Sequence, residues 1–222
     1  ERVIDALKAY ASIQSAYATP HLALEPSGVG WTLRAVSPSA DDARAALATL
    51  AQMSPSYSGP KPAAFDVNSG CTVLLLDASG AKVLLASDLE VGPGATRGWQ
   101  AVVTHFPGAL DASFVKVPHH GSDTAYHPPA WASKPTLRHA AITRFPARAQ
   151  PLPRARMVAT LRRQVDGLFI TARHAKGSNK SGLVARASTP FTSYVPTATG
   201  ALSSTGHVRL RVDATGKRIY AA

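Results

Sequence analysis

The sequence has few of the features that mark a secreted or membrane-spanning protein. Its 222 residues contain one cysteine, Cys71, which excludes an internal disulfide framework and fits a reducing compartment. No apolar run approaches the ~20 residues that a membrane-spanning helix needs, and no signal-peptide pattern opens the chain. We therefore expect a cytoplasmic protein. Hydrophobic residues make up 45% of the chain and charged residues 17%, which is the composition of a folded domain.

Acidic residues are scarce in the C-terminal part. Residues 1–130 hold 8 Lys/Arg and 11 Asp/Glu, a net charge of −3, whereas residues 131–222 hold 16 and 2, a net charge of +14. This surplus favours an anionic partner or substrate. A solvated basic face, or a face that meets an acidic partner chain, is the alternative, because the basic residues are not interleaved with aromatic ones as in many nucleic-acid-binding segments.

Apolar periodicity predicts strands that alternate with helices, and therefore an α/β fold with a mixed sheet. Residues 1–222 form a single domain or the C-terminal lobe of a larger one, and residues 173–205, rich in Ser, Thr, Gly and Lys, are expected to be a flexible basic segment. The expected helices cover residues 1–17, 41–53, 96–105 and 154–165, and the expected strands cover residues 31–36, 71–76, 82–86, 114–117, 139–143, 167–171, 207–212 and 217–220.

Polar side chains follow two of these predicted strands. Asp88 comes just after the strand that ends at Ala86, and His119 and His120 follow the strand that ends at Val117. In α/β folds ligands bind beyond the carboxyl ends of strands, and carboxylate and imidazole groups suit zinc or manganese. Because neighbouring side chains at a strand end point to opposite sides, we expect one histidine to face the site and the other to brace it. A loop aspartate and structural histidines are the alternative interpretation.

Three segments carry a family resemblance: the pair Asn68-Ser69, the run Val-Leu-Leu-Ala-Ser-Asp88, and the run Val-Lys-Val-Pro-His-His-Gly-Ser122. Together they resemble the later part of metallo-β-lactamase-fold hydrolases, and most nearly the hydrolase domain of DNA-uptake (competence) channel proteins. The resemblance covers roughly residues 29–172. It implies a metallo-β-lactamase-like αββα sandwich, of which this chain holds the C-terminal part.

The resemblance also implies roles for individual residues. Asp88 would bridge two divalent metal ions (zinc or manganese), and His120 would ligate one of them, with His119 as the reserve ligand. Ser87 stands where the family usually has glycine. Asn68 and Ser69 match a polar pair of this subfamily and would support the site. From their positions in the sequence we expect Ser122 and Asp123 to orient His120, and His127 to be a candidate for substrate contact.

The family's main metal motif, His-x-His-x-Asp-His, is missing from these 222 residues. A two-metal site needs about five to seven protein donors, so the N-terminal part of the same product or a partner chain is expected to complete it. The start at Glu1 instead of Met agrees with this expectation. The implied function is metal-dependent hydrolysis, and the basic C-terminal part favours a phosphodiester or a related anionic substrate.

Two other functions stay open. The chain could be a non-catalytic scaffold or interaction chain that keeps the fold without the metals. It could also be a basic nucleic-acid-binding module, and the residues available for that are Lys176, Lys180, Arg186, Arg154, Arg156, Arg162 and Arg163. In each case we expect the chain to work in an oligomer or complex.

Overall fold

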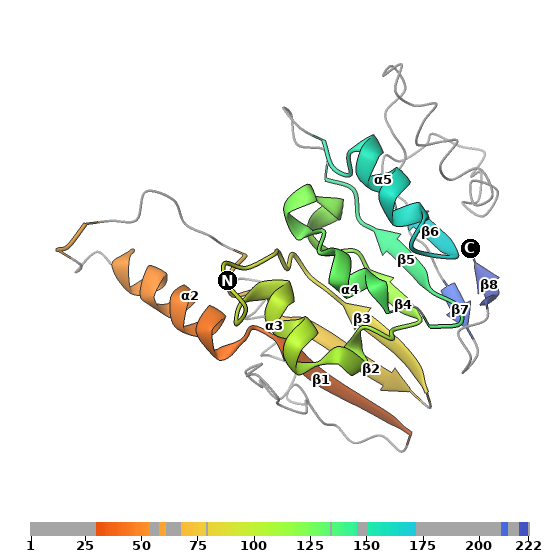
Figure 1. The fold of residues 1–222 in the computed structure, drawn as a ribbon, viewed down its shortest axis with the longest axis horizontal. Coiled ribbons are helices and arrows are strands. Elements are labelled where there is room, and N and C mark those ends of the chain that lie inside the picture. The colour runs from red at the N-terminus through yellow and green to blue at the C-terminus, as the bar shows by residue number, and fades with distance from the viewer. Residues whose placement is uncertain are drawn as a thin grey trace, which may run out of the picture.

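The structure is a computed structural model, and it describes residues 30–53, 58–60, 68–78, 80–133, 135–145, 151–171, 210–212 and 218–221. Within this part the chain is α/β, with a six-stranded mixed sheet and a separate two-stranded sheet (Figure 1). The expected α/β class and mixed sheet are therefore confirmed. The helix predicted at residues 1–17 and the flexible segment predicted at 173–205 lie outside the described residues.

The strands of the large sheet follow one another in chain order. They are β1 (Trp31–Ser37), β2 (Val73–Ala78), β3 (Ala81–Leu85), β4 (Phe114–Lys116), β5 (His139–Ile142) and β6 (Gly167–Ile170). β1, β2 and β3 pair antiparallel, and β3 to β6 pair parallel. β2 and β3 match the strands predicted at residues 71–76 and 82–86, but β2 begins at Val73 instead of Cys71. Residues 68–70 form a turn in which the Cys71 N–H donates to the Asn68 carbonyl at 3.1 Å.

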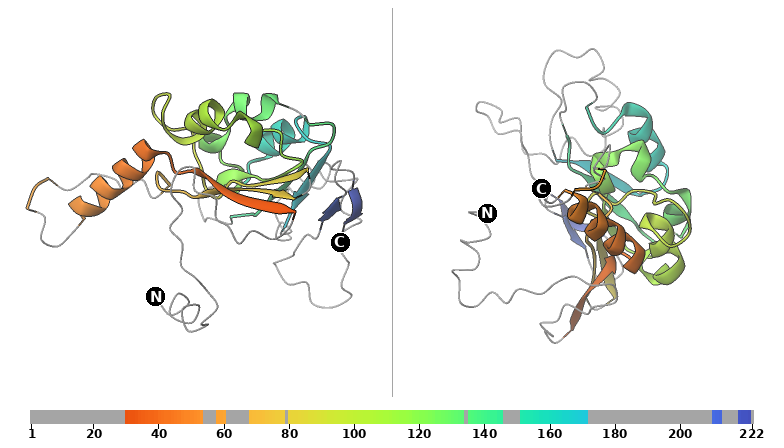
Figure 2. Two further views of the ribbon diagram at one scale, coloured as in Figure 1. Left: turned by 90° about the horizontal axis from the view of Figure 1, so that it is seen from below. Right: turned by 90° about the vertical axis from the view of Figure 1, so that its left-hand side faces the viewer.

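Helices connect the parallel strands. They are α3 (Gly98–His105), α4 (Pro128–Ala132) and α5 (Ala155–Arg162). All three lie on one face of the sheet (Figure 2). Right-handed crossovers that always move in the same direction across a sheet put every connecting helix on the same side, which explains this arrangement. A longer helix, α2 (Ala40–Gln52), projects from the β1 side of the molecule (Figure 1). Ser39 caps it, with the Asp42 N–H donating to the Ser39 hydroxyl at 3.0 Å.

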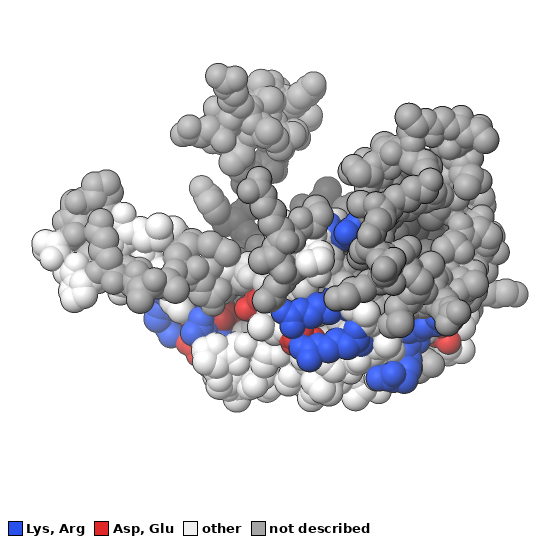
Figure 3. Space-filling view, turned by 90° about the horizontal axis from the view of Figure 1, so that it is seen from above, with Lys and Arg blue, Asp and Glu red and all other residues white. Residues whose placement is uncertain are grey.

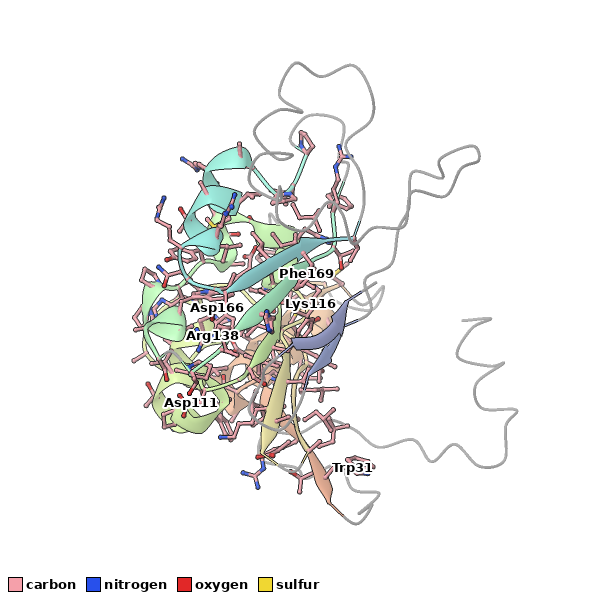
Figure 4. All side chains as sticks on the ribbon, turned by 90° about the vertical axis from the view of Figure 1, so that its right-hand side faces the viewer. Trp31, Asp111, Lys116, Arg138, Asp166 and Phe169 are labelled. Carbon is pink, nitrogen blue, oxygen red and sulfur yellow. The ribbon has the colours of Figure 1, made fainter. Side chains whose placement is uncertain are left out.

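The main core lies between the sheet and these three helices. Strand side chains alternate between the two faces, so Val115 packs into this core while its neighbour Lys116 lies on the opposite face. Trp99 and Trp131 are buried in this core. Figure 4 shows Lys116 and Phe169 from the side of the molecule that carries β6 and the small sheet.

The amino ends of the parallel strands hold a buried arginine. Arg138 is 1% exposed, and its guanidinium donates to the carbonyls of Ala112, Trp131, Leu110 and Ser133. It also lies 5.8 Å from the centre of the Trp131 ring, in a cation–π arrangement. Burial lowers the pKa of Arg138 from its ordinary value, and the nearby carboxylates Asp111 and Asp166 oppose that shift (Figure 4). The Arg138 side chain therefore links the segment that precedes β4 to the end of α4.

The small sheet lies where the last two strands, at residues 207–212 and 217–220, are predicted. It consists of β7 (Leu210–Val212) and β8 (Arg218–Ala221), which pair antiparallel. Among the described helices, none combines the length and the apolar character needed to cross a lipid bilayer.

Candidate functional site

The carboxyl ends of β3 and β4 bring the predicted site residues together. The two strands are parallel, with Leu85 opposite Lys116, so the segments that follow them leave the sheet at the same edge. The backbone N–H of His119 donates to the Ser87 carbonyl at 3.1 Å, which joins the two segments directly. Asp88, His119 and His120 therefore lie at one edge, as predicted. Figure 3 shows the molecule from the top of Figure 1, with basic side chains spread over the face and acidic ones between them.

The backbone of this edge is strained. Ser87, His119 and His120 have φ angles of 46°, 41° and 54°, and they are the non-glycine residues with positive φ in the described part of the chain. A side chain in this left-handed region costs roughly 1–2 kcal/mol relative to the right-handed one. Strain of this kind concentrates at sites where function fixes the backbone. All three residues lie at the carboxyl ends of β3 and β4, and this is independent support for a site there.

The left-handed backbone also changes the directions in which the two histidine side chains point. The chain leaves the regular strand after Lys116 and turns through Pro118–Gly121, so the alternation expected for neighbouring strand residues does not apply. Each histidine instead approaches a different carboxylate, His120 that of Asp88 and His119 that of Glu90. The prediction that one histidine faces the site and the other braces it stays a prediction, with His120 beside Asp88 and His119 beside Glu90.

His120 is held in one orientation from behind. Its Nδ1 lies 2.8 Å from the Thr143 carbonyl, which can only accept, so Nδ1 carries the proton in the neutral ring. The ring stacks on Phe145, with centroids 5.1 Å apart and planes at 27°. Nε2 is left as the lone-pair nitrogen, 4.0 Å from Oδ1 of Asp88. This is the arrangement of metal-binding histidines, whose second nitrogen is bonded to a carbonyl or carboxylate.

His119 forms the second pair of the site. Its Nδ1 makes a close contact with Oε1 of Glu90, and the same oxygen accepts a hydrogen bond of 2.7 Å from the Thr124 hydroxyl. Ser122 extends this series of hydrogen bonds, because its hydroxyl lies 2.9 Å from the Thr124 hydroxyl. Glu90 was not predicted from the sequence. It comes two residues after Asp88, in the segment that follows β3, and this position was the signal that could have found it.

The group that orients His120 differs from the two side chains that were predicted to do so. Asp123 accepts hydrogen bonds from Arg154 at 3.2 Å and from Arg156 at 2.6 and 3.1 Å, so it anchors the start of α5. Ser122 bonds to Thr124, as described above. The Thr143 carbonyl performs the orienting role that was assigned to these two side chains.

Lys116 is a further charged residue of this edge. Its ammonium donates to the Ser87 carbonyl at 2.8 Å and lies 3.7 Å from Oδ1 of Asp88. Burial lowers the pKa of Lys116 from its ordinary value, and the Asp88 carboxylate offsets part of that effect. Lys116 was not predicted from the sequence, because a lysine inside a short strand is typical of a solvated side chain.

The remaining predicted residues lie around this edge. Asn68 and Ser69 belong to the turn that enters β2, beside the carboxyl end of β3, because Leu74 of β2 pairs with Leu85. His127 precedes α4, where its carbonyl accepts a bond of 2.9 Å from the Ala130 N–H, and burial lowers its pKa. In the described part of the chain, neither a hydrogen bond nor an ion pair joins His127 to Asp88 or the histidine pair.

Asp88 and His120 are of the types that bind a metal ion, but two donors are too few to hold one. Two ligands of a tetrahedral zinc ion at ~2.1 Å each are ~3.4 Å apart, so the 4.0 Å between Asp88 and His120 needs only a small closure. Within the residues that the structure describes, however, no three or more His, Cys, Asp or Glu side chains form a group that could hold a metal ion. Two donors alone do not make a closed site.

Comparisons with protein-family models, with curated proteins and with solved structures each found no match to this chain. The resemblance to metallo-β-lactamase-fold hydrolases therefore depends on the three sequence segments described above.

Proposed function

We propose that the chain provides part of the site of a metal-dependent hydrolase that acts on a phosphodiester or a related anionic substrate. Asp88 and His120 are its ligands, with His119 in reserve, and the other donors come from the N-terminal part of the same product or from a partner chain. The proposal includes a metallo-β-lactamase-like αββα sandwich. The six-stranded sheet, with helices on one face, would be one half of that sandwich.

One observation carries the proposal: the Thr143 carbonyl fixes the proton of His120 on Nδ1, which leaves the Nε2 lone pair facing the Asp88 carboxylate. Imidazole nitrogen and carboxylate oxygen are both zinc ligands. A bound divalent ion would lower the pKa of a water molecule and stabilise negative charge on the substrate. The chain's own residues then have two roles: Thr143 and Phe145 hold the ring, and the basic C-terminal part attracts an anionic substrate.

The test uses the full-length gene product. Zinc and manganese content are measured by elemental analysis, and hydrolysis is measured with bis(p-nitrophenyl) phosphate, for wild type, Asp88→Asn and His120→Gln. We expect bound metal in the wild type and a loss of at least about tenfold in metal affinity and in hydrolysis for each variant, since each removes a ligand. His105→Gln, an exposed histidine at the end of α3, is the matched control and should behave as wild type. Wild-type protein without metal, or full metal content in Asp88→Asn, would contradict the proposal.

A second candidate is the non-catalytic scaffold. The specific observation in its favour is the shortage of donors: the described residues bring no three metal-binding side chains together. In the experiment above, a full-length product that folds, binds no metal and hydrolyses no phosphodiester would select this function.

A further inference from the structure

The outer half of α2 exposes an apolar surface. Leu47, Leu50 and Met53, spaced three residues apart, are 67%, 54% and 50% exposed. Residues 45–53 include no Asp, Glu, Lys or Arg. A helix that faces water normally carries charged or polar side chains on its outer side, and an apolar side is normally covered. These three side chains form the α2 surface, and their chemistry indicates that another segment packs on it.

The base of α2 is fixed to the body of the protein. Asp42 is buried and accepts hydrogen bonds from the Gly98 N–H at 2.8 Å and from Arg97 Nε at 2.9 Å. One turn further along, a Cβ added to Gly70 would lie 3.4 Å from Cβ of Ala46. Beyond this contact the helix continues away from the sheet (Figure 1). The α2 surface therefore lies on a helix whose direction is set by contacts at its base.

The N-terminal segment of the chain has a matching pattern. The sequence predicts a helix at residues 1–17, outside the described residues, and Ile4, Leu7 and Tyr10 have the same three-residue spacing as the α2 surface. A helix of this length is ~25 Å long, and α2, with 13 residues, is ~20 Å long. Two helices of similar length, each with one apolar stripe, bury both stripes when they pair.

The connection to β1 determines the direction in which this helix would run. Residues 18–29 span ~40 Å only when they are fully extended. The base of α2 is ~23 Å from Gly30, which is the length of the seven-residue β1, and the tip of α2 is ~20 Å further. A connection that is less than fully extended therefore reaches the base and not the tip. A helix over residues 1–17 that lies along α2 must then run antiparallel to it.

We propose that residues 1–17 form a helix that packs antiparallel on the α2 surface. With residue 17 level with the first residue of α2, the two apolar stripes lie side by side, in the pairs Tyr10–Leu47, Leu7–Leu50 and Ile4–Met53. The antiparallel direction also places opposite ends of the two helix dipoles together, which is favourable. The inference does not depend on the proposed function.

The first test is amide hydrogen exchange of the full-length product, followed by mass spectrometry. In wild type, residues 3–17 should exchange at least about tenfold more slowly than an unstructured peptide, because a packed helix protects its amides. Leu47→Gln/Leu50→Gln removes the apolar contacts and keeps good helix formers in α2, so residues 3–17 should lose that protection while β2 to β5 keep theirs. Leu85→Gln is the matched control, because Leu85 is also an exposed leucine (40%) but lies on β3, and it should exchange as wild type does.

The second test is cross-linking, which also works if the double variant unfolds. All native cysteines are replaced, including Cys71, and Leu7→Cys is combined with Leu50→Cys in one chain. A short bis-maleimide should join the two positions within one molecule, as shown by peptide mass mapping. The control pair, Leu7→Cys with Leu85→Cys, should remain unlinked.

Each of four results would overturn the inference. They are exchange of residues 3–17 as in an unstructured peptide in wild type, equal protection of these residues in wild type and in Leu47→Gln/Leu50→Gln, a link from Leu7→Cys to Leu85→Cys within one molecule, and a Leu7→Cys to Leu50→Cys link between two molecules. The third would place the N-terminal segment on the sheet, and the fourth would assign the α2 surface to a second copy of the chain. Metal content and hydrolysis, which decide the proposed function, are measured separately.

Discussion

The two ends of the parallel strands hold two positive charges in opposite circumstances. At the amino ends, Arg138 is 1% exposed, and its guanidinium donates to four backbone carbonyls. At the carboxyl ends, Lys116 is 25% exposed, donates to one carbonyl, and lies 3.7 Å from a carboxylate that is itself partly open to solvent. The backbone at the carboxyl ends is strained at Ser87 and at both histidines, whereas none of the non-glycine residues described at the amino ends has a positive φ.

The two charges therefore have different effects. Arg138 is a buried cation whose guanidinium makes four hydrogen bonds to backbone carbonyls, so it holds loops in place and leaves little capacity for a ligand. Lys116 is partly exposed and lies beside the strained backbone of Ser87, so it keeps the capacity to exchange partners. The amino ends therefore contribute stability, and the carboxyl ends carry the proposed site.

The largest effect is expected from Arg138→Met, which removes the buried charge and leaves four carbonyls without their donor. The free energy of unfolding should fall by at least about 3 kcal/mol, measured by urea denaturation, because each unsatisfied buried group costs about 1–3 kcal/mol. Arg163→Met, which changes an exposed arginine at the end of α5, is the control and should change it by less than about 0.5 kcal/mol. A fall below 1 kcal/mol for Arg138→Met would remove the distinction between the two ends.

A smaller effect of opposite sign is expected at the carboxyl ends. Ser87 has a φ of 46°, which glycine adopts without strain, so Ser87→Gly should raise the free energy of unfolding by about 0.5–1 kcal/mol. Ser122, with a φ of −64°, is the matched position, and Ser122→Gly should lower it. Urea denaturation checks both. A destabilised Ser87→Gly protein would show that the backbone here is not strained.

The smallest effect is expected in how the free energy of unfolding depends on pH. The lowered pKa of Lys116 means that the folded state binds fewer protons than the unfolded state between that pKa and the ordinary 10.5, so this residue's contribution to stability rises with pH across the window. In Lys116→Met the rise should be smaller than in wild type, measured by urea denaturation between pH 7 and 10.5. Lys82→Met is the control and should behave as wild type, because Lys82 donates to the Gly108 carbonyl at 3.0 Å. An unchanged profile would mean that Lys116 is solvated in solution.

Much of the fold and half of the site could be predicted from the sequence. Alternating apolar runs located the strands, and the positions of Asp88 and His120 just past two of them predicted that they meet. Glu90 and Lys116 were missed, because pattern alone does not distinguish a surface charge from one that packs against a strand end. The left-handed conformation of the two histidines was missed for a different reason: it follows from contacts such as the bond from the His119 N–H to Ser87, which are remote in sequence.

The strand order of the large sheet has a consequence for how the protein is made. Since each strand pairs with the strand that precedes it in the chain, the sheet can grow by adding one strand at a time during synthesis on the ribosome. Each addition closes only the loop of its own crossover, which keeps the entropy cost of each step small. The carboxyl-end edge is then complete only after β5 has joined β4, because Thr143 and Phe145, which hold the His120 ring, follow β5 in the chain.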